Sequence, residues 1–451
     1  MFDAGIACCK QAGPKLFYAA LMAAAKRSPV LWICIAVLLA RLFILFQVYA
    51  IDPQRVLNSD SPSYQGPARA LVKLGRFSQS PEAPDLPEIE RTPGYPLFIA
   101  FSYKLAGEDD RMMLVLQIIT SVLTVALAAA IAGELWGKKA AMPAALLLAL
   151  DPISFLYSLL VFAEDLFALI LTFHVWIVLR LLGEKRQPWL WALASGLTLA
   201  AATHVRPIAY YFILPLLLTI VWAFRREPMS WTRSLLIALV VFAAWAPAVL
   251  GWQVRNYRLT GMSDFSSIQA INLFLYRGAG IVAQQDGTTL EAAQDKLLAE
   301  APAAAKASDA TWYAYCKREG LRLMREHPLL MFEVQVKGAG RMLFGPGVAS
   351  FDKYFGSVGR YVTSYSVIYL IGIYGLVIIC LINLFRQRPL ILGQHLFLGV
   401  VVIYLVCISA GPEANSRFRS PVMPILAAFA AGGVRRRAWQ EDKTSRQPAK
   451  D

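Results

Sequence analysis

Long apolar runs recur along this chain and constrain its fold more than any other feature. A helix needs about 20 mainly apolar residues to cross a hydrocarbon core about 30 Å thick. Ten such runs are present, near residues 29–50, 112–135, 139–158, 165–182, 189–204, 208–224, 234–252, 362–385, 390–410 and 420–433. The chain is 57% hydrophobic and only 16% charged, which is more apolar surface than a soluble domain of 451 residues could bury. The sequence therefore predicts an all-α polytopic membrane protein with about ten transmembrane helices.

Basic residues indicate the orientation of these helices. When ten helices are threaded, the main clusters fall on one side, and these are Lys26-Arg27, Lys138-Lys139, Lys185-Arg186, Arg225-Arg226 with Arg233, Arg386 with Arg388, and Arg435-Arg436-Arg437. Loops rich in Lys and Arg stay in the cytoplasm. This placement accounts for the net charge of +14 without a nucleic-acid partner. The first run is too long for the apolar region of a cleaved leader, so we expect a retained anchor and two cytoplasmic termini.

The threading divides the chain into five parts. They are a cytoplasmic N-terminal segment (1–28), an N-terminal transmembrane core (29–252) with the first external loop (51–111), an external loop or cap (253–361), C-terminal transmembrane helices (362–433) and a basic cytoplasmic tail (434–451). Helical patterns at 290–298 and 311–327 favour a small folded cap. Residues 93–107 are apolar but short for a span, so both a crossing helix and an interfacial helix stay open. A crossing would put Lys138 and Lys139 outside, against the charge pattern.

The first external loop and the fourth span carry the most informative carboxylates. Asp60 precedes Ser61-Pro62-Ser63, a pattern that an N-cap explains as well as chemistry does. Glu164 and Asp165 lie at the outer mouth of the fourth span, where the helix dipole favours acidic residues. Arg41 falls in the middle of the first span, and we expect it to make a structural polar contact inside the bundle.

Several arginines at the same outer face favour a functional explanation. Outer loops are normally poor in basic residues, yet this face carries Arg91, Arg206, Arg255, Arg417 and Arg419. Guanidinium groups are suited to holding a phosphate. A phosphate leaving group departs as an anion and needs only charge stabilisation, whereas an acceptor hydroxyl benefits from a carboxylate base. Carboxylates and arginines together predict a transferase that uses a lipid-phosphate sugar.

Five segments resemble the GT-C glycosyltransferases, in order along most of the chain. They are Asp60-x-x-x-Tyr64, Arg91-Thr92-Pro93-Gly94-Tyr95-Pro96, Glu164, Trp252-x-x-Arg255-Asn256 and Arg417-x-Arg419-x-Pro421-x-x-Pro424. The resemblance is closest to the bacterial branch that contains the aminoarabinose transferase of lipid A and relatives of the protein O-mannosyltransferases. It implies a GT-C-like bundle with external interfacial helices in the bacterial cytoplasmic (inner) membrane. The active site would face the periplasm or exterior.

The same resemblance implies a chemistry and a set of site residues. A hexosyl or pentosyl group would pass, with inversion, from a polyprenyl-phosphate-linked donor to a hydroxyl or phosphate of a lipid, glycan or protein. The catalytic carboxylates would be Asp60 and Glu164. The donor phosphate would contact Arg91, Arg255, Arg417 and Arg419, and further candidates are Tyr64, Asp165, His204 and Arg206. Ser61 stands where the family commonly has a second acidic residue, and no metal site is predicted, although a divalent cation stays open as a cofactor.

Two other classes of protein stay open at this point. A transporter or flippase for a lipid-linked glycan would typically show paired repeats and broken helices near the midplane, which this sequence lacks. A non-catalytic assembly subunit would not need carboxylates at both Asp60 and Glu164. The sequence gives neither the sugar, nor the acceptor, nor the oligomeric state.

Overall fold

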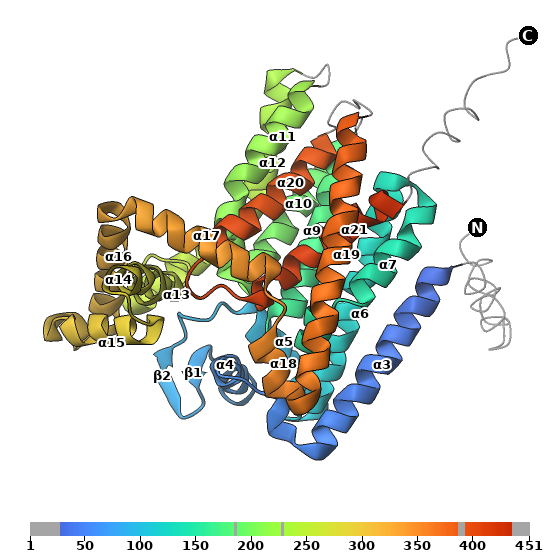
Figure 1. Cartoon of the computed structure of the whole chain (residues 1–451). Helices are drawn as coiled ribbons and strands as arrows, with labels where there is room; N and C mark the ends of the chain where they lie inside the picture. Colours follow the sequence, from blue (N-terminus) through green and yellow to red (C-terminus); the bar gives the residue numbers. More distant parts are fainter. Residues whose placement is uncertain (1–27, 185–186, 227–229, 387–392, 435–451) are drawn as a thin grey trace, which may run out of the picture.

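The structure, a computed structural model, describes residues 28–184, 187–226, 230–386 and 393–434 and is built almost entirely of helices (Figure 1). The N-terminal half contains α3 (Pro29–Ile51), α4 (Ser61–Leu74), β1 (Ser78–Ser80), β2 (Ala83–Pro87), α5 (Gly94–Ala106), α6 (Asp110–Trp136), α7 (Ala141–Ala149), α8 (Pro152–Tyr157), α9 (Glu164–Gly183), α10 (Trp189–Val205), α11 (Ile213–Arg226) and α12 (Trp231–Thr260). The C-terminal half contains α13 (Ile268–Ile271), α14 (Ala279–Asp286), α15 (Leu290–Glu300), α16 (Asp309–Glu326), α17 (Pro328–Phe344), α18 (Val348–Phe355), α19 (Gly359–Arg386), α20 (Gly393–Ser409) and α21 (Met423–Val434).

Short 3-10 and π segments connect several of these helices. They are η1 (Pro53–Val56), η2 (Lys138–Ala140), η3 (Pro207–Phe212), the π-helix η4 (Asn272–Gly278), η5 (Ala303–Ala307), η6 (Gly356–Val358) and η7 (Ser416–Val422). The predicted cytoplasmic ends, 1–27 and 435–451, lie outside the described residues. So do Lys185-Arg186, one of the predicted basic clusters.

The prediction of about ten spans is confirmed in part. Within the described residues, six helical segments are long and apolar enough to cross a membrane, and they are Pro29–Ile51, Asp110–Trp136, Glu164–Gly183, Pro207–Arg225, Trp231–Thr260 and Val348–Arg386. Two further predicted spans form the shorter apolar helices α10 and α20. The protein is therefore a multi-pass membrane protein whose apolar helices differ in length.

The remaining two predicted spans, 139–158 and 420–433, are interrupted for local reasons. The run at 139–158 breaks between α7 and α8, because the Asp151 carboxylate accepts from the Ser154 backbone N–H and Pro152 occupies the first turn of α8. The run at 420–433 begins in η7, with Pro421 inside it, and only α21 continues as an α-helix. Hydropathy alone does not reveal these breaks.

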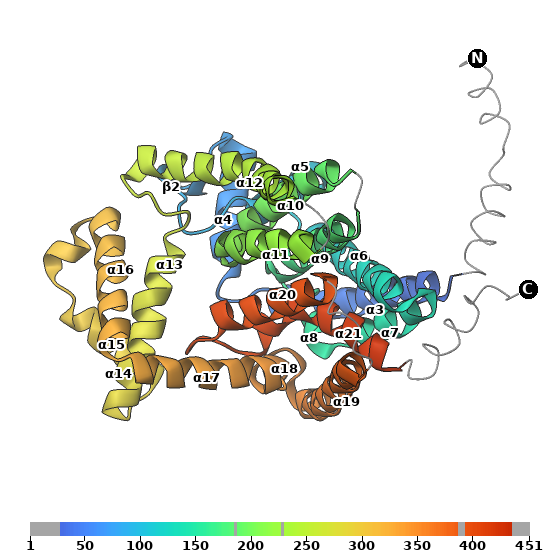
Figure 2. The ribbon, with the colours of Figure 1, turned by 90° about the horizontal axis from the view of Figure 1, so that it is seen from above.

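The helices form a bundle with a lobe at its side. In the bundle α10 packs between α9 and α12, and α21 packs against α6, α7 and α19. We call α13 to α17 the cap, which projects beside the bundle in both ribbon views (Figures 1 and 2). The cap has its own apolar core, built from Ala270, Phe274, Ala279, Ile281, Val282, Ala293, Leu297, Cys316 and Leu323. Helices α15 and α16 lie where the sequence predicts them.

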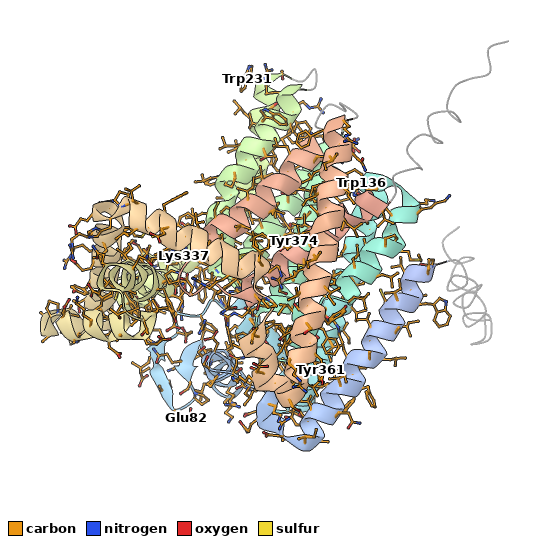
Figure 3. All side chains as sticks on the ribbon, in the orientation of Figure 1. Glu82, Trp136, Trp231, Lys337, Tyr361 and Tyr374 are labelled. Atoms are coloured by element: carbon orange, nitrogen blue, oxygen red, sulfur yellow. The ribbon has the colours of Figure 1, made fainter. Side chains whose placement is uncertain are left out.

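The first external loop folds at one end of the bundle. Strands β1 and β2 pair antiparallel, β1 packs on α4, and α4 packs on α5. Figure 3 shows Glu82, between the two strands, and Trp231, the first residue of α12, at opposite ends of the molecule. Residues 93–107, for which two placements stayed open, form the 13-residue helix α5, which contacts α4, α6 and α10 and is not among the six long apolar segments.

Helix α17 joins the cap to the bundle through a close backbone contact. Arg341 on α17 donates to the carbonyl oxygens of Gly411 (2.9 Å), Pro412 (3.1 Å) and Ala414 (3.2 Å). In return Arg419 donates to the carbonyls of the α17 end, at Met342, Leu343 and Gly345. A Cβ on Gly338 would lie 2.3 Å from Gly411 O, so only glycine permits this approach.

We expect Gly338→Ala to destabilise the protein, because the methyl group meets backbone atoms that cannot move without displacing the chain after α20. The cost should be about 1–3 kcal/mol, measured as a lower thermal unfolding temperature in detergent. Gly340→Ala is the matched control on the same helix, since a Cβ there meets nothing within 4 Å. Equal unfolding temperatures for the two variants would contradict the expectation.

Candidate active site

Charged side chains from separate segments meet in one ion-pair network at the end of the bundle where α4 and α9 begin. Asp60 Oδ2 accepts a hydrogen bond from Arg417 Nη1 at 3.0 Å, and Asp60 Oδ1 lies 3.5 Å from Arg91 Nη2. Glu164 Oε1 lies 3.2 Å from Arg417 Nε and 2.7 Å from Arg206 Nη1. Arg417 therefore stands between the two carboxylates, and the structure brings together residues that lie far apart in the sequence.

Asp60 is free of the capping role that its sequence context suggests. It occupies the N-cap position of α4, but its side chain makes no capping hydrogen bond. The N-cap explanation is wrong on this point, because the carboxylate faces Arg417 and Arg91 instead. Asn58 Oδ1 accepts from the Asp60 backbone N–H at 2.7 Å and so holds the turn before α4.

Two backbone connections place Asp60 next to Glu164. The Val161 N–H donates to Val56 O at 2.9 Å, and Ser61 Oγ donates to Val161 O at 3.0 Å. Since Val161 lies three residues before Glu164, these bonds fasten the first external loop to the turn that opens α9. The local sequence on either side gives no sign of this pairing.

Arg91 and Arg206 come together through the contact between the α5 start and the α10 end. Thr92 Oγ1 donates to Val205 O at 3.3 Å, and a Cβ on Gly94 would lie 2.7 Å from His204 O. The Thr-Pro-Gly sequence after Arg91 thus allows the two segments to touch. Arg91 also donates from Nε to Ser63 Oγ at 2.8 Å and lies over the Tyr64 ring, 4.6 Å from its centroid.

The two carboxylates of the network that pair with Arg417 differ in their exposure to solvent. The Asp60 side chain is 28% exposed, whereas that of Glu164 is only 2% exposed. Glu164 is the first residue of α9, where the helix dipole stabilises a negative charge. Its Oε2 has no hydrogen-bond partner among the described residues. Asp60 is therefore the carboxylate open to a substrate, and Glu164 is the one enclosed by protein.

Opposite charges keep the outer part of the network ionised. Burial raises the pKa of Asp60, but the guanidinium groups of Arg417 and Arg91 outweigh it and hold that pKa below its ordinary value. Burial lowers the pKa of Arg417, while Glu164 and Asp60 raise it, and the net pKa lies above its ordinary value. Arg91 also lies 3.6 Å from Glu90 Oε1, so three guanidinium groups face three carboxylates, Asp60, Glu164 and Glu90, and the formal charges of the network balance.

Four other residues predicted for the site lie outside this network. Arg255 donates to Glu88 O (2.6 Å) and Phe77 O (3.0 Å), and Arg419 is fully buried with the α17 carbonyls as partners. His204 Nδ1 donates to Ala200 O at 2.8 Å, and the ring packs against Trp252 and Phe265. These side chains hold backbone segments and aromatic rings, so their sequence-predicted placement in one site with Asp60 is not what the structure has. The fourth residue is Asp165.

Asp165 faces a polar cavity behind the network. The cavity is small and is lined by Arg41, Ser121, Thr124, Val125, Leu148, Ser154, Asp165, Ala168, Ser420 and Pro424. Arg41 is buried, hydrogen-bonds Ser121 Oγ and lies over the Phe155 ring. This matches the structural contact expected for Arg41 inside the bundle.

The sequence did not single out several residues that surround the network. Phe162 and Phe418 flank the Arg417 guanidinium, at 4.7 and 4.9 Å from the ring centroids. Tyr276 lies on η4 of the cap, within electrostatic range of Asp60, Arg417 and Arg91, and burial raises its pKa. The one usable signal was the Phe418 position between Arg417 and Arg419. A π-helix such as η4 is often found at functional sites but leaves no mark in the sequence.

No group of three or more His, Cys, Asp or Glu side chains within the described ranges is placed to hold a metal ion. Asp60 pairs with the guanidinium groups of Arg417 and Arg91, and the residue that follows it is Ser61 rather than a second acid.

Comparison with known proteins gives a family match over part of the chain and a fold. Residues 90–247 match the family model described as dolichyl-phosphate-mannose-protein mannosyltransferase, a stretch that includes Arg91, Glu164 and Arg206. No curated protein matches the chain in sequence.

Solved structures extend the comparison to the whole chain. The archaeal oligosaccharyltransferase AglB from Archaeoglobus fulgidus, in complex with an inhibitory peptide and a dolichol-phosphate, is 12% identical, with a TM-score of 0.52 over 93% of this chain and 52% of that one. This chain thus spans about half the length of that oligosaccharyltransferase. ArnT from Cupriavidus metallidurans in the apo state is 15% identical, with a TM-score of 0.41 over 89% of this chain and 77% of that one. Residues 90–247 are therefore similar to this mannosyltransferase family, and the chain has the fold of that oligosaccharyltransferase.

Proposed function

We propose that the protein transfers a sugar from a polyprenyl-phosphate-linked donor to an acceptor hydroxyl or phosphate at the outer face of a bacterial cytoplasmic membrane. The observation that carries the proposal is the placement of Asp60 between Arg417 and Arg91, two guanidinium groups on one partly exposed carboxylate. The acceptor is a lipid, glycan or protein. The network combines a partly exposed carboxylate with guanidinium groups, the two kinds of group that such a transfer uses.

The two guanidinium groups beside Asp60 support an anionic leaving group. Arg91 and Arg417, whose side chains are 16% and 20% exposed, are cations that can stabilise a donor phosphate as its bond to the sugar breaks. The matched family model is named for a dolichyl-phosphate sugar, and the archaeal oligosaccharyltransferase was solved with a dolichol-phosphate. A polyprenyl phosphate donor fits both the charge and these relatives.

Asp60 is the group we assign to the acceptor. When the donor phosphate competes for Arg417 and Arg91, their hold on the Asp60 carboxylate weakens and its affinity for a proton increases. Asp60 then orients the acceptor oxygen and takes its proton as that oxygen bonds to the anomeric carbon. The carbon–phosphate oxygen bond breaks in the same step, the polyprenyl phosphate leaves with the electron pair, and a single displacement inverts the configuration.

Glu164 has a different part in this proposal from the catalytic one that the sequence suggests. Its carboxylate is enclosed by protein and pairs with both Arg206 and Arg417. A buried carboxylate that holds two arginines fixes their positions before the donor arrives. We therefore assign Glu164 to positioning Arg417.

The orientation rests on where the helices begin and end. Pro29 at the start of α3 and Val434 at the end of α21 lie at the end of the bundle away from the network (Figure 1). In the sequence Lys26-Arg27 precede the first and Arg435-Arg436-Arg437 follow the second. Since basic residues favour the cytoplasm, the network faces the periplasm or exterior.

A buried glutamate supports the turn that carries Arg91. Glu88 Oε1 accepts from the backbone N–H groups of Glu90 (2.6 Å) and Arg91 (2.7 Å). Burial outweighs these hydrogen bonds and raises the pKa of Glu88 to about 7. The turn is therefore sensitive to the protonation of one side chain near neutral pH.

Asp60→Asn should reduce sugar transfer by about 10²- to 10⁴-fold, because the amide cannot take the acceptor proton. The measurement is transfer of labelled lipid-linked sugar by membranes containing the variant at normal expression. Asp85→Asn, at an exposed position of β2, removes a charge from the same loop and should leave transfer unchanged. Full transfer by Asp60→Asn would remove the assigned role.

Arg417→Gln should lower transfer by about 10²- to 10³-fold and weaken donor binding, because the phosphate loses a buried cation. The transfer rate of Arg417→Lys should fall between those of Arg417→Gln and the wild type, since a point charge cannot reach both carboxylates as the guanidinium does. Transfer rates and donor KM are compared only between proteins whose unfolding temperatures match. Arg318→Gln, which removes an arginine that is 71% exposed on α16, is the control. An unchanged donor KM in Arg417→Gln would contradict phosphate binding by this residue.

Glu88→Gln should stabilise the protein relative to wild type as the pH rises. Between pH 4.5, the ordinary pKa, and about 7, the folded state keeps a proton that the unfolded state releases, so wild-type stability falls through this window. Glutamine stays neutral and still accepts both N–H groups. The gain should reach on the order of 1–3 kcal/mol, measured as the difference in unfolding temperature at about pH 5 and about pH 7.5. Glu291→Gln, at an exposed site on α15, should show no such change, and a pH-independent difference for Glu88→Gln would refute the assignment.

A further inference from the structure

Helix α17 has two apolar faces, only one of which is covered by protein. Val334, Gly338 and Met342 are buried against the chain that follows α20. On the opposite side the exposed apolar residues are Leu329 (83% exposed), Phe332 (69%), Val336 and Phe344. Spacings of three, four and eight residues keep these four side chains on one side of the helix.

The rest of the cap does not share this surface. From α13 to α16, residues 268–326, all of which the structure describes, no large hydrophobic side chain is exposed. The exposure on α17 instead equals that of apolar residues on the spans, such as Ile368 and Ile371 of α19 at 70% each. The cap therefore has a polar outer surface and one apolar helix face.

The depth of α17 matches the end of an apolar helix. Gln335 donates to Cys407 O in the last turn of α20, and Gly338 meets Gly411 directly after it. Figure 2 looks almost along α19, and α17 lies lengthwise across that view. The helix thus runs across the direction of a span, at the level where α20 leaves the apolar layer. Exposed Val348 on α18 and Tyr361 on α19 continue the apolar surface along the chain.

We propose that α17 lies in the interface of the same membrane that α19 crosses, with Leu329, Phe332, Val336 and Phe344 among the lipid chains. An interfacial helix needs an apolar face and polar residues beside it. Here Glu333 and Lys337, paired at 2.7 Å, border the apolar face. The occupant of this surface is lipid, because the face is as exposed as the apolar residues of the spans, lies beside the end of α20, and is the one apolar part of the cap surface among the described residues.

This contact would fix the active site relative to the lipid surface. Arg341, on the same helix, holds the carbonyls of Gly411, Pro412 and Ala414, only a few residues before Arg417. The membrane contact of α17 therefore sets the height of the segment that carries Arg417. If the proposed function holds, this is the height at which the phosphate of a lipid-linked donor arrives.

Nitroxide labels test the proposal without any activity assay. Single cysteines replace Phe332 and Val336 in full-length protein whose six native cysteines are changed to alanine, reconstituted in phosphatidylcholine vesicles. Collision rates are measured with oxygen, which concentrates in lipid, and with a water-soluble nickel chelate. Ile368 of α19 is the lipid-facing reference, and Glu291 of α15 is the water-facing one.

The proposal expects a ratio of oxygen to nickel collisions at both positions close to that of Ile368 and well above that of Glu291. Ratios equal to that of Glu291 would overturn it, because the face would then lie in water. Protection from both reagents would also overturn it, since a second copy or another protein would then cover the helix. Each labelled protein must elute as the unlabelled one does in gel filtration, so that misfolding is not mistaken for exposure.

Discussion

The position of Arg417 between Asp60 and Glu164 is the interaction on which the rest of the site depends. The Arg417 guanidinium pairs with two carboxylates that come from different helices. Two further arginines complete the network, since Arg91 pairs with Asp60 and Arg206 pairs with Glu164. Buried like charges repel strongly, so neither the two acids nor the three bases could gather at this point alone. The alternation of charge lets these side chains gather at one point.

Backbone contacts between distant segments hold this alternation in place. Val161 bonds the first external loop at Val56 and Ser61, and Thr92 reaches Val205 where Gly94 permits close approach. Arg341 and Arg419 exchange hydrogen bonds with carbonyls across the cap boundary. The arginines predicted for the site therefore divide into two groups. Some, such as Arg417, pair with Asp60 and Glu164, and others, such as Arg419, fix the chain that carries them.

This division also means that an arginine at the outer face can have either of two roles. An arginine outside the cytoplasm is uncommon, and the sequence predicts phosphate binding for four of the five, Arg91, Arg255, Arg417 and Arg419. A guanidinium can also satisfy three backbone carbonyls at once, and Arg419 does so at the end of α17. Only the neighbours of each side chain distinguish the two uses, and those neighbours lie some 70 residues or more away in the chain.

The sequence by itself determined that this protein is solvated largely by lipid and at which end of the bundle the candidate site residues lie. Apolar runs of span length require lipid, and Asp60, Arg91, Glu164, Arg206 and Arg417 could be selected as candidates because charge beside a span is costly and uncommon. The tertiary structure decided which candidates meet, that Asp151 and Pro421 interrupt two predicted spans, and that α17 keeps an exposed apolar face. These outcomes depend on hydrogen bonds and packing between segments far apart in the chain, which local periodicity and composition do not encode.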